Sequence, residues 1–337
     1  MHDHFTVVHD ANITTSNSEY TIAYKTCQKI INISETIDAT ADIDLKARFH
    51  NYLMLKDRMP RTVEAYDKAV TKLLIWLYAN EISSPTPEDV VAYREELRAS
   101  GHAETTIRNY LTAVRLFFRF TEYAGIYPNV AKEVEGGKCD SPEKSYLTSG
   151  EVKTLLQSID KGTLKGLRDY AMIALMVTCG LRDIEVSRAD IGDIKPIGDS
   201  MGLYVQGKGK REKADFVKVD PIVERSINEY LTARGSRKEA EPLFTSTSNN
   251  NHNGRMTTRA ISMMIRDRLH DAGLVRPNLT AHSLRHTFVT LSLLADKDIT
   301  EVQQAARHAN VATTLIYAHH LDKAKNTCSA AVCKAIF

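Results

Sequence analysis

The sequence predicts a mainly α-helical protein with a small β-sheet, in which an N-terminal four-helix domain precedes a mixed α/β domain. Apolar residues recur at three- and four-residue steps in four stretches between about residues 43 and 134, the spacing of one helix face. Two short apolar stretches, about 203–206 and 214–219, flank a glycine-rich turn, which is typical of a β-hairpin. With 337 residues and 43% apolar composition, the chain is long enough for about two domains, each with a core.

Residues 1–42 form an acidic segment ahead of the helical pattern. They hold two lysines and six acidic residues, a net charge of −4, and because the whole chain carries +2, the remainder carries +6. The segment is rich in Thr, Ser, Asn and Asp and shows little helical periodicity, so we expect a loosely ordered or partner-dependent extension. Its acidity argues against a strong nucleic-acid-binding arm.

Four helices are expected in the domain spanning residues 43–134. The first covers about 44–56, and the second, about 61–79, carries one continuous apolar stripe. The third begins after Thr86, whose hydroxyl can cap the exposed amides while a proline occupies the first turn. The fourth covers about 104–123 and also has an apolar face. The four stripes can pack together into one core.

A linker at residues 135–146 is expected next, because Gly136 and Gly137 interrupt the periodicity. The second domain, residues 147–322, opens at Thr148 and Glu151, which have the spacing of a capping box. A buried helix around residues 170–177 should end at a glycine, followed by the hairpin and then by mostly helical structure. Residues 323–337 continue with apolar residues at helical steps, so we expect a terminal helix that docks on its own domain or on another protomer.

Composition excludes several other classes of protein. No apolar run reaches the roughly 18 residues needed to cross a bilayer, and the first 15 residues lack the basic and then apolar pattern of a signal peptide. The five cysteines are odd in number and show no paired CxxC spacing, which favours free thiols over disulfides or a zinc site. We therefore expect a protein of the bacterial cytoplasm or nucleoid with no membrane partner.

Six polar residues of the second domain together suit attack on a phosphodiester. Two arginines can hold a phosphate through planar, charge-assisted hydrogen bonds, a lysine and two histidines can move protons, and a tyrosine can act as the nucleophile. In chain order they are Arg182, Lys208, His282, Arg285, His308 and Tyr317. Each residue alone is weak evidence, since isolated arginines usually form surface ion pairs, but their joint occurrence in this order predicts a catalytic site.

The stretches around these residues resemble the tyrosine recombinases, the integrase and Xer family. The resemblance rests on residues 179–185, 207–210, 281–288 and 307–317, in the order in which the family has them. It implies the catalytic domain of that family for the second domain, and its SAM-like core-binding domain for the first. Together the likeness covers about residues 43–325.

The resemblance also implies roles for the site residues. Arg182 and Arg285 would clamp the scissile phosphate, Tyr317 would attack it, and His282 would assist proton transfer at the nucleophile. Lys208 would protonate the leaving 5′ oxygen, and His308 would donate a hydrogen bond to the phosphate. Glu185 would orient an active-site group, and Lys210 and Arg211 of the hairpin turn and Arg108, Arg115 and Arg119 of the fourth helix are candidate DNA-binding residues. No metal, ATP or other cofactor is required; the alternative is a metal site at His282 and His286, which lacks a clear third ligand.

The implied function is site-specific recombination of double-stranded DNA through a 3′-phosphotyrosyl intermediate and a Holliday junction. We expect a homotetramer on DNA, a monomer or weak oligomer when free, and possible accessory proteins. The acidic extension favours integration or excision of a mobile element. The alternatives are Xer-like resolution of chromosome or plasmid dimers, relaxation of DNA like a type IB topoisomerase, and a non-catalytic DNA-binding regulator.

Overall fold

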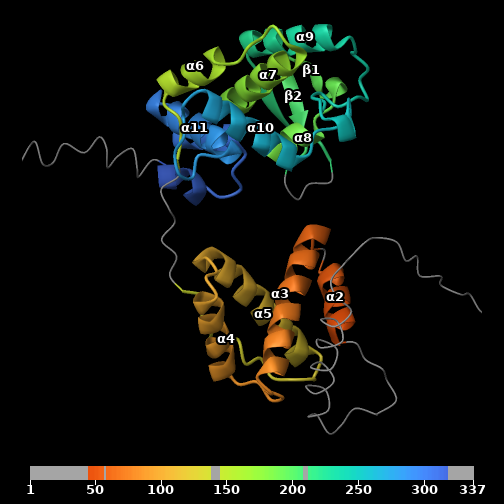
Figure 1. The fold of residues 1–337 in the computed structure, drawn as a ribbon, viewed down its shortest axis with the longest axis vertical. Helices are drawn as coiled ribbons and strands as arrows, with labels where there is room; N and C mark the ends of the chain where they lie inside the picture. Colours follow the sequence, from red (N-terminus) through yellow and green to blue (C-terminus); the bar gives the residue numbers. More distant parts are fainter. Residues whose placement is uncertain (1–44, 57, 138–144, 208–211, 318–337) are drawn as a thin grey trace, which may run out of the picture. The chain divides into compact units, whose positions relative to one another are not determined.

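The computed structural model describes residues 45–56, 58–137, 145–207 and 212–317. The chain divides into two compact units, with the boundary between Ser141 and Pro142, and each is described by itself (Figure 1). The acidic extension, the terminal segment 323–337 and most of the expected linker lie outside the described residues. So do Lys208, Lys210 and Arg211 of the hairpin turn.

The N-terminal unit contains the four expected helices (Figure 1). They are α2 (Leu45–Leu55), α3 (Pro60–Ala79), α4 (Pro87–Ala99) and α5 (Glu104–Tyr123). Thr86 caps α4 as expected: its hydroxyl accepts a hydrogen bond from the amide of Asp89, whose carboxylate accepts one from the Thr86 amide. The periodicity predicted these helices to within a residue or two because each stripe is continuous.

An aromatic and aliphatic core holds the N-terminal unit together. The ring of Phe49 on α2 lies 5.4 Å from the ring of Phe117 on α5 and meets it edge-on, the arrangement that ring quadrupoles favour. Leucines of α3 belong to the same core, in which α3 packs against α5 and α2. Fully buried core residues include Leu45, Leu53, Val70, Leu73, Leu74, Ile107, Leu111, Val114 and Phe118.

The C-terminal unit is mixed α/β and surrounds helix α7 (Leu164–Cys179). Eleven of the 16 residues of α7 are buried, and the helix packs against α9 (Pro221–Arg234) and α11 (Ala281–Leu294). The remaining helices are α6 (Ser149–Gln157), α8 (Asp183–Arg188), α10 (Thr258–Asp271) and α12 (Ile299–Ala306), with short 3-10 turns η1 (Ile191–Asp193) and η2 (Asn249–Asn251). Residues 312–317 are also helical.

The sheet has three antiparallel strands in the order β1–β2–β3, whereas the sequence predicted two. The missed strand β1 (Ile194–Ile197) has only four residues and includes Pro196. Proline has no backbone N–H to donate to a neighbouring strand, and it is tolerated here because β1 is at the edge of the sheet. Its hairpin partner β2 (Ser200–Val205) begins earlier than expected, and β3 (Asp215–Val219) pairs with β2, Leu203 opposite Val217.

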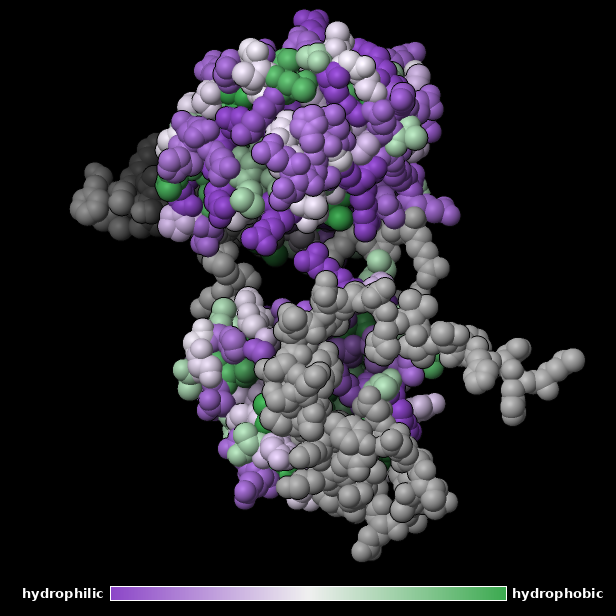
Figure 2. Space-filling model, turned by 45° about the vertical axis from the view of Figure 1, so that its right-hand side comes forward, coloured by the Kyte–Doolittle hydropathy of each residue, from purple (hydrophilic) through white to green (hydrophobic). Residues whose placement is uncertain are grey.

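The surface of the C-terminal unit is mostly polar. On the face visible in Figure 2, hydrophilic residues predominate and hydrophobic ones are scattered among them. Within the described part of the chain, no helix combines the length and the apolar character needed to cross a membrane. Of the five cysteines, the described residues include Cys179, a buried free thiol at the end of α7.

Candidate active site

Two helix ends meet at Arg285. The guanidinium of Arg285, on α11, is 2% exposed and donates one hydrogen bond of 2.6 Å to the carbonyl of Gly180, just beyond α7, and another to the carbonyl of Ala306, the last residue of α12. Carbonyls at helix C-termini carry partial negative charge and favour a cation. These contacts orient the guanidinium, and neither acceptor is a carboxylate that would cancel its charge.

A buried carboxylate links Arg182 to a second arginine. Arg182 precedes α8, and its side chain forms an ion pair of 2.7 Å with Glu185 one turn later. The Glu185 side chain is fully buried, and its other oxygen accepts hydrogen bonds of 2.8 Å from the Arg182 amide and from Arg307. Burial favours the neutral acid, but Arg307, the Arg182 amide and the Arg182 guanidinium together hold the pKa of Glu185 below its usual value.

The cluster has a surplus of positive charge. Arg182, Arg285 and Arg307 surround the single carboxylate Glu185, so two positive charges remain after pairing. Burial, and then repulsion from Arg182 and Arg307, lower the pKa of Arg285 to about 9, so that it is still a cation at neutral pH. A buried, repulsive group of cations is stabilised by a bound anion, and a DNA phosphate is such an anion.

The Tyr317 hydroxyl lies in the same unit, hydrogen-bonded to a histidine. Tyr317 is 5% exposed, its hydroxyl contacts Nδ1 of His286, and the two rings lie 5.4 Å apart. Burial raises the pKa of Tyr317 to about 12, although the nearby Arg285 cation works in the opposite direction. His282 packs edge-on against His286 with 4.6 Å between ring centroids, and its own side chain is exposed.

His308 lies between α12 and the helical segment 312–317. Its Nδ1 contacts the hydroxyl of the buried Thr314 at 2.9 Å, and its carbonyl accepts a hydrogen bond from Gln303. The first contact orients the His308 ring, and the second holds the backbone of the short loop. Because Arg307 precedes it directly, the position of His308 is tied to the arginine cluster.

The other candidate residues are on the N-terminal unit. Arg108 and Arg119 on α5 are exposed and Arg115 is half-buried. Arg115 and Arg119 follow Arg108 by seven and eleven residues, so the three side chains lie on one stripe of a helix with 3.6 residues per turn. Arg108 donates to the carbonyl of Gly137 at 3.0 Å, and Arg115 to the carbonyl of Leu111 in its own helix.

Sequence reasoning missed two members of this site, His286 and Arg307. His286 was considered only as a metal ligand, but it contacts the Tyr317 hydroxyl. Among the described residues, no cluster of three or more His, Cys, Asp or Glu side chains has an arrangement that could hold a metal ion. Arg307 lies inside a motif that carried the resemblance, but its pairing with Glu185 across 122 positions could not be deduced from spacing.

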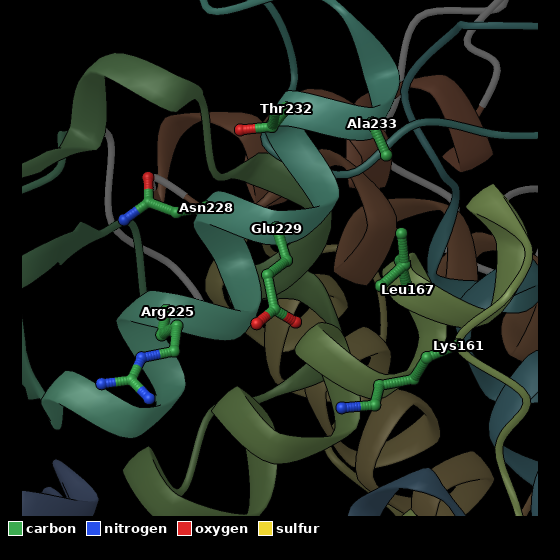
Figure 3. Close-up of a pocket in the computed structure, with 7 residues that line it drawn as sticks. All are labelled: Lys161, Leu167, Arg225, Asn228, Glu229, Thr232 and Ala233. Atoms are coloured by element: carbon green, nitrogen blue, oxygen red, sulfur yellow. The ribbon is translucent and has the colours of Figure 1, made fainter.

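A surface pocket elsewhere on the unit is not part of this cluster. Its volume is about 710 Å³, and in Figure 3 most of its lining residues come from α9, with the others from the start of α7 and the loop before it. Glu229 lies between the cationic side chains Arg225 and Lys161. The complete lining is Lys161, Leu167, Arg225, Asn228, Glu229, Thr232 and Ala233.

Comparisons with known proteins agree for both units. The model of the phage integrase family matches residues 145–324, and that of the phage integrase N-terminal SAM-like domain matches residues 47–125. Tyrosine recombinase XerC of Herpetosiphon aurantiacus is 30% identical over 70% of this chain and 76% of its own length. Tyrosine recombinase slr0733 of Synechocystis sp. is 29% identical over 78% of this chain and 88% of its own.

Solved structures share the fold. A XerH site-specific recombinase bound to palindromic difH substrate superposes with a TM-score of 0.66 at 20% identity, covering 93% of this chain and 94% of that one. The Tn1549 transposon integrase in complex with transposon right end DNA has a TM-score of 0.65 at 15% identity, covering 82% and 94%. These likenesses agree with the predicted fold class, a SAM-like helical domain followed by a mixed α/β catalytic domain.

Proposed function

We propose that this chain, which belongs to the phage integrase family of tyrosine recombinases, uses Tyr317 to cut one DNA strand at the phosphate held by Arg182 and Arg285. Membership makes it an enzyme that breaks and rejoins DNA strands by transesterification at specific sites. One observation supports the assignment of the nucleophile: the Tyr317 hydroxyl contacts His286, the residue next to Arg285 on α11 of the same chain. The proposal is therefore cleavage in cis, by the tyrosine of the same chain that holds the phosphate.

The first step exchanges one ester bond for another. The Tyr317 oxygen forms a bond to phosphorus, the bond from phosphorus to the 5′ oxygen breaks, and the 3′ end remains attached as a phosphotyrosine. Arg182 and Arg285 neutralise charge that builds up on the non-bridging oxygens, and His308 donates a further hydrogen bond. The ester keeps the energy of the broken bond, so a 5′ hydroxyl from another strand reverses the reaction without ATP.

Two proton transfers accompany this step. The phenolic proton passes to Nδ1 of His286, which already contacts the hydroxyl, and His282 supports the His286 ring from the side. The departing 5′ oxygen takes a proton from Lys208, whose position in the hairpin turn lies outside the described residues. Glu185 orients Arg182 and takes no part in proton transfer.

The helical N-terminal unit supplies a second DNA-binding surface. Arg108, Arg115 and Arg119 form a basic stripe on α5, and Lys210 and Arg211 adjoin Lys208 in the turn. Such cations bind phosphates without reading sequence, so their contribution declines as salt rises. Residues 43–134 and 147–322 would thus act as the two DNA-binding domains, and four protomers, with accessory proteins where needed, would assemble two sites and pass through a Holliday junction.

The biological task we propose is integration or excision of a mobile element in a bacterial cell. The acidic segment at residues 1–42, with its charge of −4, suits regulation by a partner. Xer-like dimer resolution is the second candidate, because relatives named XerC and XerA match this chain over 76% and 88% of their own lengths. Mapping the cleaved sites decides between them: element ends support the first, and one site per chromosome supports the second.

Covalent trapping tests the chemistry. When a duplex nicked beside the scissile phosphate is cleaved, the short fragment that carries the new 5′ hydroxyl dissociates. Rejoining is then prevented, and the protein stays attached to the 3′ phosphate of the remaining strand. We expect an adduct with the wild type and none with Tyr317→Phe, while both bind the duplex equally. An absent adduct with the wild type would favour a DNA-binding regulator. Mixing two labelled duplexes then separates strand exchange from simple relaxation of supercoils, the outcome for a topoisomerase-like enzyme.

A further inference from the structure

Arg307 has a backbone conformation that is unfavourable for its residue type. It ends α12 with φ of 55°, in the left-handed region where the Cβ of an L-residue costs roughly 1–2 kcal/mol. The other non-glycine residues with positive φ among those described are Glu81, Asn253, Asn278 and Asp296. Arginine lacks the short polar side chain that makes Asn and Asp tolerable there, and the local hydrogen bond of Arg307 instead runs from its terminal nitrogen to the Ala305 carbonyl at 2.9 Å. An unfavourable conformation kept at a site suggests a compensating role.

The side chain of Arg307 is committed to the arginine cluster. It is 9% exposed, and one terminal nitrogen contacts Glu185 at 2.8 Å and the Gly180 carbonyl at 3.3 Å. The same carbonyl holds Arg285. The Arg307 backbone oxygen in turn accepts a hydrogen bond of 3.3 Å from Arg182. Arg307 therefore touches the carboxylate, the carbonyl and the guanidinium that set the geometry of the phosphate clamp.

Sharing the carboxylate changes the charge that the clamp can offer. If Glu185 paired with Arg182 alone, the two charges would cancel, and Arg285 would be the one uncompensated cation of the group. With Arg307 on the second oxygen, the group keeps two net positive charges. The buried Nε of Arg307 has no acceptor among the described residues, so the protein leaves part of this cation's hydrogen-bonding capacity unused.

We propose that Arg307 is a positioning residue of the phosphate site. It shares the Glu185 carboxylate with Arg182, orients the Arg182 guanidinium and maintains the excess positive charge that faces the scissile phosphate. This inference rests on the proposed function, because it assumes that Arg182 and Arg285 hold that phosphate. The competing interpretation is purely structural: Arg307 would only end α12 and fill space beside α8.

Two substitutions at Arg307 are expected to rank in opposite order of cleavage rate under the two interpretations. Arg307→Gly removes the cation and relieves the left-handed backbone, whereas Arg307→Lys retains a cation and the unfavourable φ. If the charge matters, single-turnover cleavage of the nicked duplex follows wild type, then Lys, then Gly, with Gly slower by at least about tenfold because a charge-assisted contact is lost. If the backbone matters, Gly equals or exceeds the other two.

A second readout separates charge from shape. On a duplex with a neutral methylphosphonate at the scissile position, the deficit of Arg307→Gly relative to wild type should shrink, because less negative charge must be neutralised. Arg234→Ala is the matched control: this buried arginine also pairs with a glutamate, Glu241, but it lies on α9. It should cleave both duplexes like the wild type, and thermal unfolding of all variants confirms their fold.

The results leave two distinct ways to be wrong. Cleavage by Arg307→Gly at the wild-type rate, or a Lys variant no faster than Gly, overturns the positioning role and leaves Tyr317 chemistry intact. Failure of the wild type to form any adduct overturns the proposed function itself. If the wild type cleaves the phosphodiester but not the methylphosphonate, the order of Lys and Gly on the phosphodiester still decides.

Discussion

Burial makes the Tyr317 hydroxyl a weak nucleophile in the free protein. Its pKa of about 12 is set by burial, with Arg285 opposing, so at neutral pH the phenolate is a very small fraction. In the proposed reaction, a proton acceptor must therefore act as the Tyr317 oxygen attacks. His286 can be this proton acceptor, because its Nδ1 already contacts the Tyr317 hydroxyl. A bound phosphate attracts the arginines but does not remove the need for a proton acceptor.

Replacing His286 by Ala should slow formation of the covalent adduct by about a hundredfold, the usual scale of a positioned base. Without a proton acceptor, only Tyr317 that is already ionised can attack. Because the pH stays well below the Tyr317 pKa of about 12, the phenolate fraction, and with it the remaining rate, should rise about tenfold per pH unit above neutrality. Single-turnover cleavage between pH 7 and 8 measures this, because Arg285, with a pKa of about 9, stays mostly a cation over that range. Incorporating a fluorinated, more acidic tyrosine at 317 should restore much of the rate.

The matched control for that experiment is His270→Ala, on the exposed surface of α10, which should leave the rate unchanged. A normal rate in His286→Ala together with a slow His282→Ala would instead assign the proton to His282. The sequence brought both histidines to one helix face through their four-residue spacing. It could not show which of them meets Tyr317, because that contact spans 31 positions and depends on how α11 packs against the segment 312–317.

At the level of elements, the sequence predicted the helices of the first domain and the strands β2 and β3, but it missed β1. Helices α3 and α5 each repeat their apolar stripe over 20 residues, so the pattern itself defines where they begin and end. The four-residue β1 has no such repetition and is defined by its pairing with β2. The sequence predicted that the buried helix α7 ends at a glycine, but it gave no boundary for α12 and could not show that the two helix ends converge on Arg285.

The end of α7 gives an element-scale prediction. Gly180 has φ of 60°, and an added Cβ would lie 2.4 Å from a ring carbon of Phe288 on α11. Gly180→Ala should therefore cost more than the roughly 1–2 kcal/mol of the backbone term alone. It should also slow cleavage, because α7 and α11 must separate and the Gly180 carbonyl that holds Arg285 moves.

Gly235→Ala isolates the backbone term. Gly235 ends α9 with φ of 75° and has nothing within 4 Å of the added Cβ. Chemical denaturation should show a smaller loss of unfolding free energy for Gly235→Ala than for Gly180→Ala, with cleavage near the wild-type rate in the former. Equal losses in the two variants would mean that Phe288 moves aside at little cost and that the Arg285 site does not depend on tight packing at this helix end.

On the scale of the whole molecule, each unit has a separate hydrophobic core. The cluster around Phe49, Leu73 and Phe117 belongs to residues 45–134, and the one around Met172, Leu175 and Leu203 to residues 147–284. The sequence predicted this division from the glycine-rich break, because a change in periodicity needs no knowledge of tertiary contacts. The strength with which two such units hold DNA then depends on the covalent connection between them.

A cut between the units should therefore weaken DNA binding without unfolding either unit. In the intact chain, binding of one unit raises the effective concentration of the other, which commonly adds a factor of about 100 to 10,000 to the overall affinity. We expect a protease site inserted between Gly137 and Ser145 to lower affinity on that scale once cleaved, as measured by fluorescence anisotropy. The uncut protein with the same insertion is the control, and circular dichroism should show the helical content of both pieces preserved. If affinity were unchanged after cleavage, one unit alone would carry the binding, and the arginine stripe on α5 would have no part in holding DNA.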